Sequence, residues 1–435
     1  MSLDILNPPR GMRDITGEEA RLYFHLFTVF SETALKNGFD PIITPTVEYY
    51  KLFEAKSGEE IKRSMYVFED KGGRLLALRP EVTASVIRVY LREMRGRPKP
   101  IKLYYISQCF RYEEPQKARY REFWQGGLEV IGDESVNGDV SAAYTASVFL
   151  DNLGVEHTYM VGNVAIYRAF MNMLKIPPEE QDHLLHLIDK EMDEQLMKEL
   201  QDKYGEEAKE IILKLMRSRL EEVVSLVEEF KQELGGDLDK AVNETRRLED
   251  FSKTLTDLGY RVEFNPRLVR GLAYYTGLIW EYKVARGLEV SIGGGGRYDG
   301  LTSVYSRIHE YSTGLALGLD RIALVLWDKR DIVLAKRGYT GVILVLSGNI
   351  PLSLGYALAR RLRSRFTSIS VLQTKNIEKA LRQADRSGVD IAVIIGEREF
   401  KEGVVSVRDL VKKVQETVPL SDVEDYFDRY LSQNR

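Results

Sequence analysis

Two glycine-rich segments of this chain place cations beside aromatic hydroxyl groups. Residues 268–277 read Leu-Val-Arg-Gly-Leu-Ala-Tyr-Tyr-Thr-Gly, and residues 293–300 read Gly-Gly-Gly-Gly-Arg-Tyr-Asp-Gly. Arg270 supplies a fixed positive charge, because a guanidinium stays protonated at any working pH. Tyr274, Tyr275 and Tyr298 supply rings and hydroxyls that can recognise the shape and hydrogen bonds of a ligand. The two segments therefore predict a site that holds a small zwitterion against a polyphosphate.

A third segment predicts a phosphate-binding loop at the end of a strand. Residues 110–123 contain the cations Arg111, Lys117, Arg119 and Arg121. A strand-end arginine that faces a basic loop can hold one phosphate while the loop covers the others. On these residues alone, an exposed charged hairpin remains an open alternative.

The motifs resemble those of a known class of enzymes. Residues 110–123 match the second signature motif of class II aminoacyl-tRNA synthetases, and residues 314–321 match the third. Residues 38–45 resemble the first motif, which forms the dimer interface in that class. Residues 268–277 and 293–300 closely resemble the paired histidine-binding signatures of histidyl-tRNA synthetases.

The resemblance to histidyl-tRNA synthetases covers nearly the whole chain. It extends from residues 9–14 to residues 384–388 and 403–410, which resemble the anticodon-binding domain of the family. It implies a catalytic role for Arg111 and Arg270, which would flank the α-phosphate of ATP. It implies a histidine site made of Glu81, Thr83, Gln125, Glu129, Tyr274, Tyr275 and Tyr298. It implies an ATP site made of Arg111, Glu113, Arg119, Arg121, Arg270 and Arg321.

The chemistry of these side chains agrees with the implied roles. A substrate ammonium needs acceptors, which Glu81, Thr83 and Gln125 supply, and an imidazole N–H needs one more, which Glu129 can supply. A site that hydrogen-bonds both ends of its ligand can reject analogues by roughly 10⁴ to 10⁵, so no editing domain is required. Taken in isolation, Glu81 and Glu129 could also be helix-capping or surface carboxylates.

The resemblance implies an ATP-dependent histidine–tRNA ligase. Histidine would attack the α-phosphate of ATP to give histidyl-adenylate, and the histidyl group would then pass to the 3′ end of histidine tRNA. We expect L-histidine, ATP with Mg²⁺, this tRNA and a second copy of the chain in a homodimer as partners, and no structural metal held by the protein. The chain lacks a window of ~18 apolar residues and an apolar N-terminal segment, which predicts a cytoplasmic protein without a membrane anchor.

Three positions depart from the family pattern. Ala273 stands where Asp is usual, Glu114 where bacterial members have arginine, and Ala118 where glycine is usual. These differences indicate an archaeal-type or otherwise divergent branch. Two alternatives to the ligase are a paralogue such as the regulatory subunit of ATP phosphoribosyltransferase, which senses histidine, and a tRNA-binding protein with an inactive site. The first typically lacks the anticodon-binding domain.

Several residues carry a simpler interpretation. The single cysteine, Cys109, excludes an internal disulfide and a multi-cysteine zinc site, and it reads as a buried strand residue. Residues 293–296 lack the Gly-Lys-Ser/Thr ending of a phosphate loop. His183 and His186 lie three apart on a predicted helix without a glutamate between them in the metalloprotease arrangement, which favours a solvated helix face over a metal site.

Charge is distributed unevenly along the 435 residues. The net charge of −4 argues against a globally basic nucleic-acid binder. Residues 331–435 carry 17 Lys and Arg against 13 Asp and Glu, a net +4, and the remainder carries 45 against 53, a net −8. A mildly basic C-terminal part on an acidic body suits a protein that contacts a polyanion with one end, although ordinary solvated surface explains the charge equally well.

The pattern of elements predicts three parts. Residues 1–327 form an α+β catalytic core with an antiparallel sheet flanked by helices, interrupted by a helical insertion at about 170–258, and residues 331–435 form an α/β anticodon-binding domain. In the core, we expect strands at 101–110 and 289–292 and a helix at 17–36. In the C-terminal domain, we expect strands of a largely parallel sheet at 341–346, 369–372 and 391–395.

Overall fold

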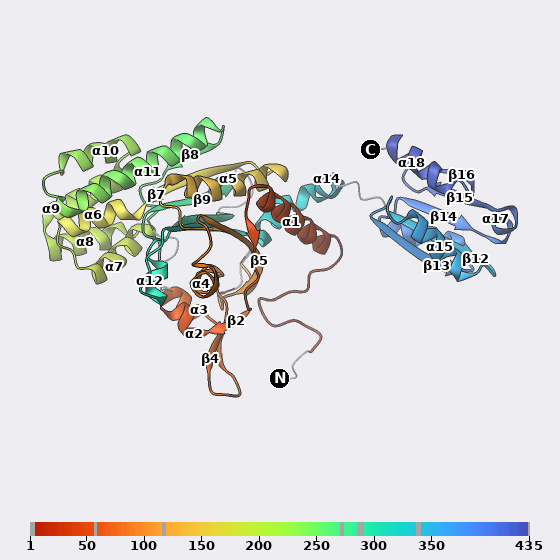
Figure 1. The fold of residues 1–435 in the computed structure, drawn as a ribbon, viewed down its shortest axis with the longest axis horizontal. Coiled ribbons are helices and arrows are strands. Elements are labelled where there is room, and N and C mark those ends of the chain that lie inside the picture. Colours follow the sequence, from red (N-terminus) through yellow and green to blue (C-terminus); the bar gives the residue numbers. More distant parts are fainter. Residues whose placement is uncertain are drawn as a thin grey trace. The chain divides into compact units, whose positions relative to one another are not determined.

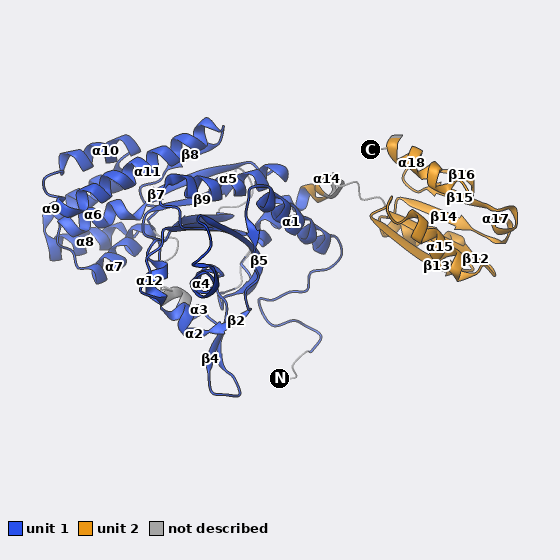
Figure 2. Ribbon diagram, in the orientation of Figure 1, with its two compact units in different colours: residues 1–328 blue, residues 329–435 orange. Residues whose placement is uncertain are grey.

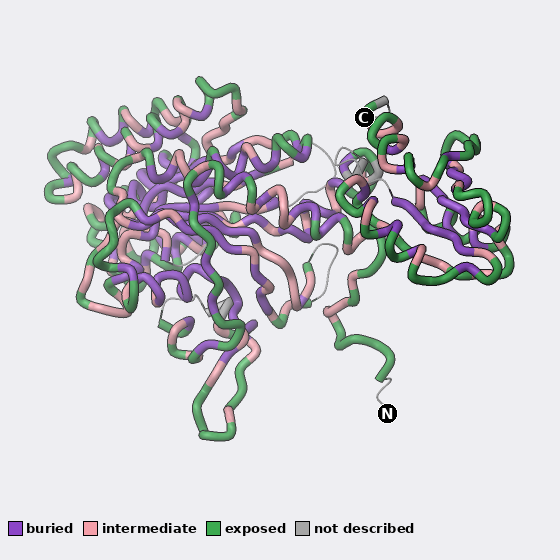
Figure 3. Tube along the Cα trace, turned by 45° about the vertical axis from the view of Figure 1, so that its right-hand side comes forward, coloured by how far each residue is buried: buried purple, intermediate pink, exposed green. Residues whose placement is uncertain are grey.

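The computed structural model describes residues 5–55, 59–114, 119–269, 274–284, 291–335 and 341–433. The chain divides into two compact units, Met1–Asp328 and Lys329–Arg435, which are coloured separately in Figure 2. Buried residues follow the strands of both units, as Figure 3 shows. No helix in the described part of the chain is long and apolar enough to cross a membrane.

The first unit is built on a mixed sheet of eight strands in its described residues (Figure 1). Their order across the sheet is β1 (Asp40–Pro41), β5 (Ile101–Phe110), β6 (Glu122–Ile131), β11 (Ser312–Gly318), β10 (Gly293–Arg297), β9 (Leu278–Val284), β7 (His157–Asn163) and β8 (Arg261–Phe264). The prediction of an antiparallel sheet is confirmed for the five pairings from β5 to β7. The edge pairs β1/β5 and β7/β8 are parallel. A helical crossover separates β7 from β8, and such a crossover allows a strand to return in the same direction.

Helices cover both faces of this sheet. The helices of the first unit are α1 (Gly17–Lys36), α2 (Tyr50–Glu54), α3 (Glu59–Ser64), α4 (Thr83–Val89), α5 (Val136–Asn152), α6 (Val164–Met173), α7 (Pro178–Asp189), α8 (Asp193–Tyr204), α9 (Glu206–Arg217), α10 (Leu220–Glu229), α11 (Leu238–Asp257), α12 (Leu301–Tyr305) and α13 (Leu319–Leu326). Shorter turns are the π-helix η1 (Tyr90–Met94) and the 3₁₀-helices η2 (Gly235–Asp237) and η3 (Trp327–Lys329). The predicted helix at 17–36 is confirmed, and the inserted segment is helical from α7 to α11.

Alternation along β5 and β6 separates the core from the face that carries the polar site residues. Tyr104 of β5 pairs with Leu128 of β6, and the ring of Tyr104 meets Phe30 of α1. Tyr105 pairs with Gly127 and packs in the apolar cluster that contains residues of α4. Because successive side chains of a strand point to opposite faces, the odd-numbered residues of β5 and β6 face α4.

One strand prediction was misplaced. We expected a strand at 289–292, but residues 289 and 290 lie outside the described residues and β10 begins only at Gly293. The strand therefore contains the glycine run that would ordinarily weaken it. Its neighbours explain this, because a Cβ on Gly295 would lie 2.4 Å from the backbone oxygen of Gly314 and one on Gly294 would lie 2.7 Å from that of Trp280.

A small sheet stands beside the main one. Its order is β2 (Val47–Tyr49), β4 (Leu75–Leu78) and β3 (Val67–Glu69), all antiparallel. Apolar side chains on and near it remain exposed, including Ile43 at 94% and Tyr49 at 55%. Ile43 lies within the segment that resembles the dimer motif, and Tyr49 follows it.

The second unit has a five-stranded sheet in its described residues. Its order is β13 (Ser368–Thr374), β12 (Gly341–Ser347), β14 (Ile391–Ile395), β15 (Val404–Asp409) and β16 (Val414–Pro419). Its helices are α14 (Arg330–Ala335), α15 (Leu352–Leu362), α16 (Ile377–Arg386), α17 (Glu397–Glu402) and α18 (Val423–Gln433). The three expected strands are confirmed and run parallel, whereas β15 and β16 form an antiparallel hairpin. Its turn contains Lys413 at a φ of 58°.

Candidate active site

Small residues form the floor of the site on the face of the sheet that α4 covers. The register aligns Glu129 of β6 with Gly314 of β11, and Gly314 with Gly296 of β10. A Cβ on Gly314 would lie 1.9 Å from Oε2 of Glu129, and one on Gly127 would lie 2.1 Å from the ring of Tyr105. These glycines are therefore required because a carboxylate and an aromatic ring lie flat against the sheet at their positions.

Glu129 is a buried acid with two hydroxyl donors. Its exposed fraction is only 1%, and Thr83 Oγ1 donates to its Oε1 at 2.6 Å. The hydroxyl of Tyr298 donates to Oε2. Burial raises the pKa of Glu129 to about 8, against the lowering effect of the two hydroxyl donors. The surface-carboxylate alternative for Glu129 is wrong, and an acid of this kind can meet a ligand donor without competition from bulk water.

Glu81 lies just before α4. Its carboxylate fits both the helix-capping interpretation and the interpretation as a buried site residue. It accepts the backbone N–H of Ala84 at 3.1 Å, so the helix-capping alternative is observed. Yet it is also buried, and burial raises its pKa. Thr83, the first residue of α4, connects this carboxylate region to Glu129.

Three tyrosines predicted from the glycine-rich segments come together around this acid. The rings of Tyr274 and Tyr275 lie 5.4 Å apart, and those of Tyr274 and Tyr298 lie 5.7 Å apart, both edge to face. Burial, followed by nearby carboxylates, raises the pKa of Tyr274, so its phenol stays neutral. Tyr105 belongs to the same cluster and was not predicted. The feature that could have indicated Tyr105 is that this aromatic residue of β5 lies opposite a glycine of β6.

A pocket of about 140 Å³ lies beside this cluster. Its lining includes four predicted ATP-site residues, Arg111, Glu113, Arg119 and Arg321, together with Gln125 of the predicted histidine site. Burial, together with the like charges of Arg119 and Arg111, lowers the pKa of Arg321. Three arginines with Glu113 and Asp320 leave the lining with more positive than negative charge, so the pocket suits a polyphosphate.

Gln125 lines the pocket and contacts Cys109 of the apolar cluster. Its Oε1 accepts the thiol of Cys109, with the sulfur and oxygen 3.2 Å apart. Cys109 is buried in β5, as expected, and burial raises the pKa of its thiol to about 12. The thiol therefore fixes the side-chain amide and is not a nucleophile.

Arg111 and Arg121 take different positions although both belong to the basic segment. The Nε of Arg111 donates to the backbone oxygen of Pro80 at 3.0 Å, and its side chain lines the pocket. Arg121 is buried instead, with its guanidinium 3.7 Å from the ring centre of Tyr112 and its Nε donating to the carbonyl of Glu113. Arg121 therefore shapes the loop, whereas Arg270, the other predicted catalytic arginine, lies outside the described residues. So do Lys117, Ala118 and Ala273.

A polar junction ties the N-terminal segment to the pocket wall. Asp320 accepts the backbone N–H of Trp124 at 2.6 Å, the hydroxyl of Tyr23 at 2.7 Å and the guanidinium of Arg13 at 3.0 Å. The guanidinium of Arg13 also lies 4.1 Å from the ring centre of Tyr120, which lines the pocket. Sequence reasoning missed this junction because its members lie about 300 residues apart.

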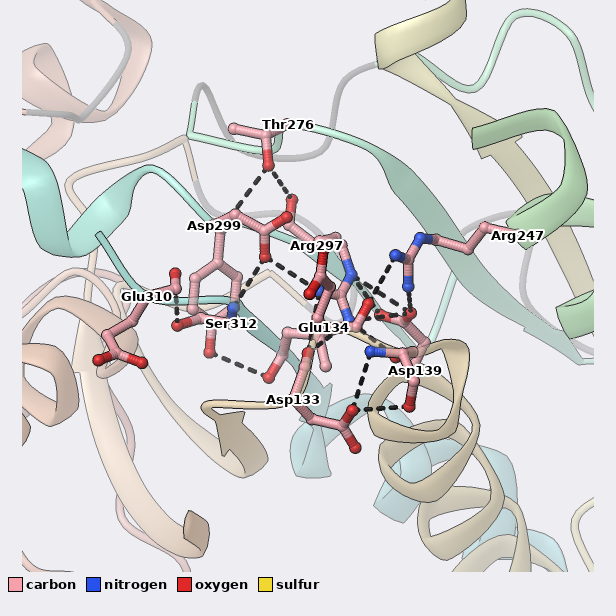
Figure 4. A network of polar contacts seen from close by, with 12 residues as sticks. Asp133, Glu134, Asp139, Arg247, Thr276, Arg297, Asp299, Glu310 and Ser312 are labelled. Carbon is pink, nitrogen blue, oxygen red and sulfur yellow. Dashed lines mark hydrogen bonds and ion pairs between the residues drawn. The ribbon is translucent and has the colours of Figure 1, made fainter. Parts of the chain in front are cut away.

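A second unpredicted network surrounds Arg297, the residue before Tyr298 (Figure 4). Its guanidinium contacts Asp139, Asp299 and the backbone oxygen of Asp133.

No cluster of three or more metal-ligating side chains occurs among the described residues. The Nε2 of His183 donates to the carboxylate of Glu199 at 3.0 Å on the surface of the helical segment.

The sheet, its three motif segments and the arginine-lined pocket define a class II aminoacyl-tRNA synthetase. Residues 11–322 match the histidyl-tRNA synthetase family, and residues 342–430 match the anticodon binding domain. The histidine–tRNA ligase of Sulfolobus acidocaldarius is 37% identical over 430 residues, which cover 98% of this chain and 99% of that protein. The histidine–tRNA ligase of Saccharolobus solfataricus is 38% identical over 424 residues, with 96% and 97% covered. The chain belongs to the histidyl-tRNA synthetase family.

Solved structures show the same fold. The histidyl-tRNA synthetase of Nostoc superposes with a TM-score of 0.78 at 22% identity, covering 98% of this chain and 99% of that chain. A Bacillus halodurans protein described as an ATP phosphoribosyltransferase regulatory subunit/histidyl-tRNA synthetase gives a TM-score of 0.72 at 21% identity, covering 90% and 98%. The fold alone does not separate the ligase from the regulatory paralogue, but the anticodon binding domain at 342–430 argues against the paralogue.

Proposed function

We propose that the chain is a histidine–tRNA ligase that activates L-histidine with ATP and transfers it to histidine tRNA. The observation that carries this proposal is the position of Glu129, a buried acid beside the arginine-lined pocket. An acid held by Thr83 and Tyr298 can accept an imidazole N–H, and the neighbouring arginines can hold phosphates. The full-length similarity to histidine–tRNA ligases supports the same reaction.

The amino acid would lie on the glycine floor. Glu81, Thr83 and Gln125 offer acceptors for its ammonium, Glu129 accepts from its ring, and the three tyrosines Tyr274, Tyr275 and Tyr298 enclose it. A neutral phenol can donate as well as accept, so the tyrosines can complete the hydrogen bonds of a zwitterion. A ligand that lacks one of these groups leaves a buried partner unsatisfied, which is the physical basis of selectivity.

ATP would occupy the adjoining pocket. Arg111 and Arg270 would stabilise the charge that develops on the α-phosphate, while Arg119 and Arg321 would hold the outer phosphates. Arg121 would act on ATP only indirectly, by shaping the loop. These residues supply fixed charge and orientation, and no acid or base is needed beyond the carboxylate of the substrate.

Mg²⁺ would enter as part of the MgATP substrate. Both oxygens of Asp320 already accept hydrogen bonds, whereas Glu113 lines the pocket among three arginines and fits a cation carried by phosphates. The ion would shield the outgoing pyrophosphate when bound.

A homodimer is the proposed assembly. The exposed side chain of Ile43 lies in the dimer-motif segment, and Tyr49, Phe68 and Leu75 on or beside the small sheet are also exposed. Exposed apolar groups gathered on one element are typical of a covered surface. Light scattering on the purified chain tests this assembly.

The second unit would bind the anticodon arm, and the protein would act in the cytoplasm.

Histidine-dependent exchange of labelled pyrophosphate into ATP tests the proposed function. The wild type should exchange only when histidine is present, and Arg111→Ala should lose that activity. Arg261→Ala removes an arginine that is 75% exposed and paired with Glu263, and it should exchange like the wild type. Histidine binding without exchange would indicate the regulatory paralogue, and neither binding nor exchange would indicate an inactive tRNA-binding protein.

A further inference from the structure

A fully buried arginine forms the centre of the network in Figure 4. The side chain of Arg297 has an exposed fraction of 0%, as does that of its partner Asp139, and their closest ion-pair contact is 3.3 Å. Its two terminal nitrogens donate to the backbone oxygens of Asp133 and Ser135 and to Asp299 at 2.9 to 3.1 Å. Every side of this guanidinium is therefore satisfied by protein, so Arg297 holds structure and does not reach a ligand.

The network fixes the segments that carry the tyrosines. Asp299 accepts the backbone N–H of Ser312 at 2.8 Å and donates its own N–H to the hydroxyl of Thr276 at 3.1 Å. The backbone N–H of Thr276 donates to the oxygen of Arg297 at 2.7 Å. Thr276 directly follows Tyr275, and Arg297 directly precedes Tyr298. The positions of these tyrosines therefore depend on the same hydrogen bonds.

The helical segment reaches this network through α11. Arg247 of α11 donates to Asp139 at 3.0 Å and to the backbone oxygen of Glu134 at 2.7 Å. Its side chain is 15% exposed, so the pair is only slightly screened by solvent. In Figure 4, the side chains of Arg247 and Arg297 both reach the carboxylate of Asp139.

A second contact of α11 lies close to the first. Glu244, one turn before Arg247, accepts from the side-chain amide of Asn163 at 2.9 Å and pairs with Arg247 at 3.3 Å. A Cβ on Gly277 would lie 2.6 Å from Oε2 of Glu244, so the carboxylate packs directly on the end of the tyrosine segment. The same helix thus touches both segments that carry the tyrosines, one directly and the other through Asp139.

We propose that Arg247, supported by Glu244, is a positioning residue for histidine, acting from the helical segment through Asp139 and Arg297 on Tyr298 and the Tyr274–Tyr275 segment. This inference rests on the proposed function, because it assigns histidine to the site that these tyrosines enclose. It gives α11 a role in recognition of the amino acid.

Charge balance explains why Arg247 matters at a distance. Arg247 and Arg297 face the carboxylates of Asp139, Asp299 and Glu244, so removal of Arg247 leaves three carboxylates with one buried arginine. A buried charge that loses its partner draws neighbouring dipoles and charges toward itself, and the remaining arginine is the nearest group. Arg297 would then shift toward Asp139 and away from Asp299, which moves the backbone on both sides of Tyr298.

The test compares Arg247→Ala with Arg168→Ala in pyrophosphate exchange. Arg168 also pairs with an aspartate of the helical segment, Asp182 at 2.6 Å, and it donates to Gln181 at 3.4 Å. We expect Arg247→Ala to raise the KM for histidine about tenfold, which corresponds to about 1.4 kcal/mol, with the KM for ATP within about twofold of the wild type. Arg168→Ala should leave both KM values unchanged.

Arg247→Lys serves as the conservative variant. It keeps the charge but offers a single ammonium in place of a fork, so it should fold and raise the KM for histidine by about threefold. This variant decides the question if Arg247→Ala does not fold. An unchanged KM for histidine in the folded variants, or equal rises in both KM values, would overturn the inference even if the melting temperature falls. Absence of histidine-dependent exchange in the wild type would instead overturn the proposed function.

Discussion

The buried acid Glu129 predicts a specific dependence of stability on pH. Burial raises its pKa from 4.5 to about 8 in the folded, ligand-free protein. A group with a raised folded-state pKa binds its proton more tightly when the protein is folded. Its contribution to stability is therefore complete below about pH 4.5 and is lost as the pH rises through about 8. The substitution Glu129→Gln removes this titration and keeps the size of the side chain.

The magnitude follows from the two pKa values. Each unit of pKa difference corresponds to about 1.4 kcal/mol. Integrated from about pH 5.5 to about pH 8.5, the deprotonation of Glu129 lowers the free energy of unfolding of the wild type by about 3 kcal/mol. The glutamine variant lacks this loss. Its stability relative to the wild type should therefore rise by about that amount over the same interval, whatever the constant offset between the two proteins.

Urea unfolding of the two proteins at several pH values measures this difference. The other titrating groups are common to both proteins, so their contributions to the free energy of unfolding cancel to first order in the difference between the two. A difference in unfolding free energy that stays constant from about pH 5.5 to about pH 8.5 would refute the reasoning, because it would mean that the carboxyl titrates alike in both states. The same variant should bind histidine more weakly, since a carboxyl can release its proton and accept the ring N–H with both oxygens, whereas an amide always carries its donor.

Three further predictions concern the floor, the catalytic charge and the second unit. Gly314→Ala should raise the KM for histidine about tenfold or more in pyrophosphate exchange, because its Cβ would lie 1.9 Å from Oε2 of Glu129, whereas Gly96→Ala, with no atom within 4 Å, should match the wild type. Arg270→Ala should abolish exchange while calorimetry still detects histidine binding, and equal losses in both would show that Arg270 only binds substrate. Removal of residues 329–435, a compact unit with its own core, should spare exchange but sharply reduce charging of tRNA, and charging that survives undiminished would rule out an anticodon-binding role.

Local sequence patterns predicted two elements of the core to the residue. The helix at 17–36 was predicted because apolar residues recur in it at helical spacing, and the strand at 101–110 because it is rich in β-branched and aromatic residues. The strand β10 was placed too early because its residues are glycines, which have no intrinsic preference for a strand. Only the neighbouring strands require small residues there, and that requirement is tertiary. The same holds for the antiparallel hairpin that follows the parallel strands of the second unit.

The sequence predicted which residue types form the candidate site, but the role of each residue depends on how deeply it is buried. Taken in isolation, Glu129 and Glu81 read as helix-capping or surface carboxylates, and only the sheet and α4 reveal that both are enclosed. Tyr105 was missed because its importance lies in its partner across the sheet, Gly127. Asp139 was missed because a lone aspartate in a helix carries no signal until an arginine from another segment meets it.

The arginines of this chain show why residue type alone does not assign function. A guanidinium can bind phosphate or can hold several backbone carbonyls, and both uses require the same donors. Arg297 and Arg121 donate to carbonyl oxygens and are buried, so their donors are committed to the fold. Arg111 donates one nitrogen to a carbonyl but lines the pocket with the rest of its side chain. The buried arginines hold the segments that carry the ligand-facing groups. Loss of a buried arginine or of a pocket arginine should therefore impair the same reaction. Separate measurements of the KM for histidine and the KM for ATP distinguish the two uses.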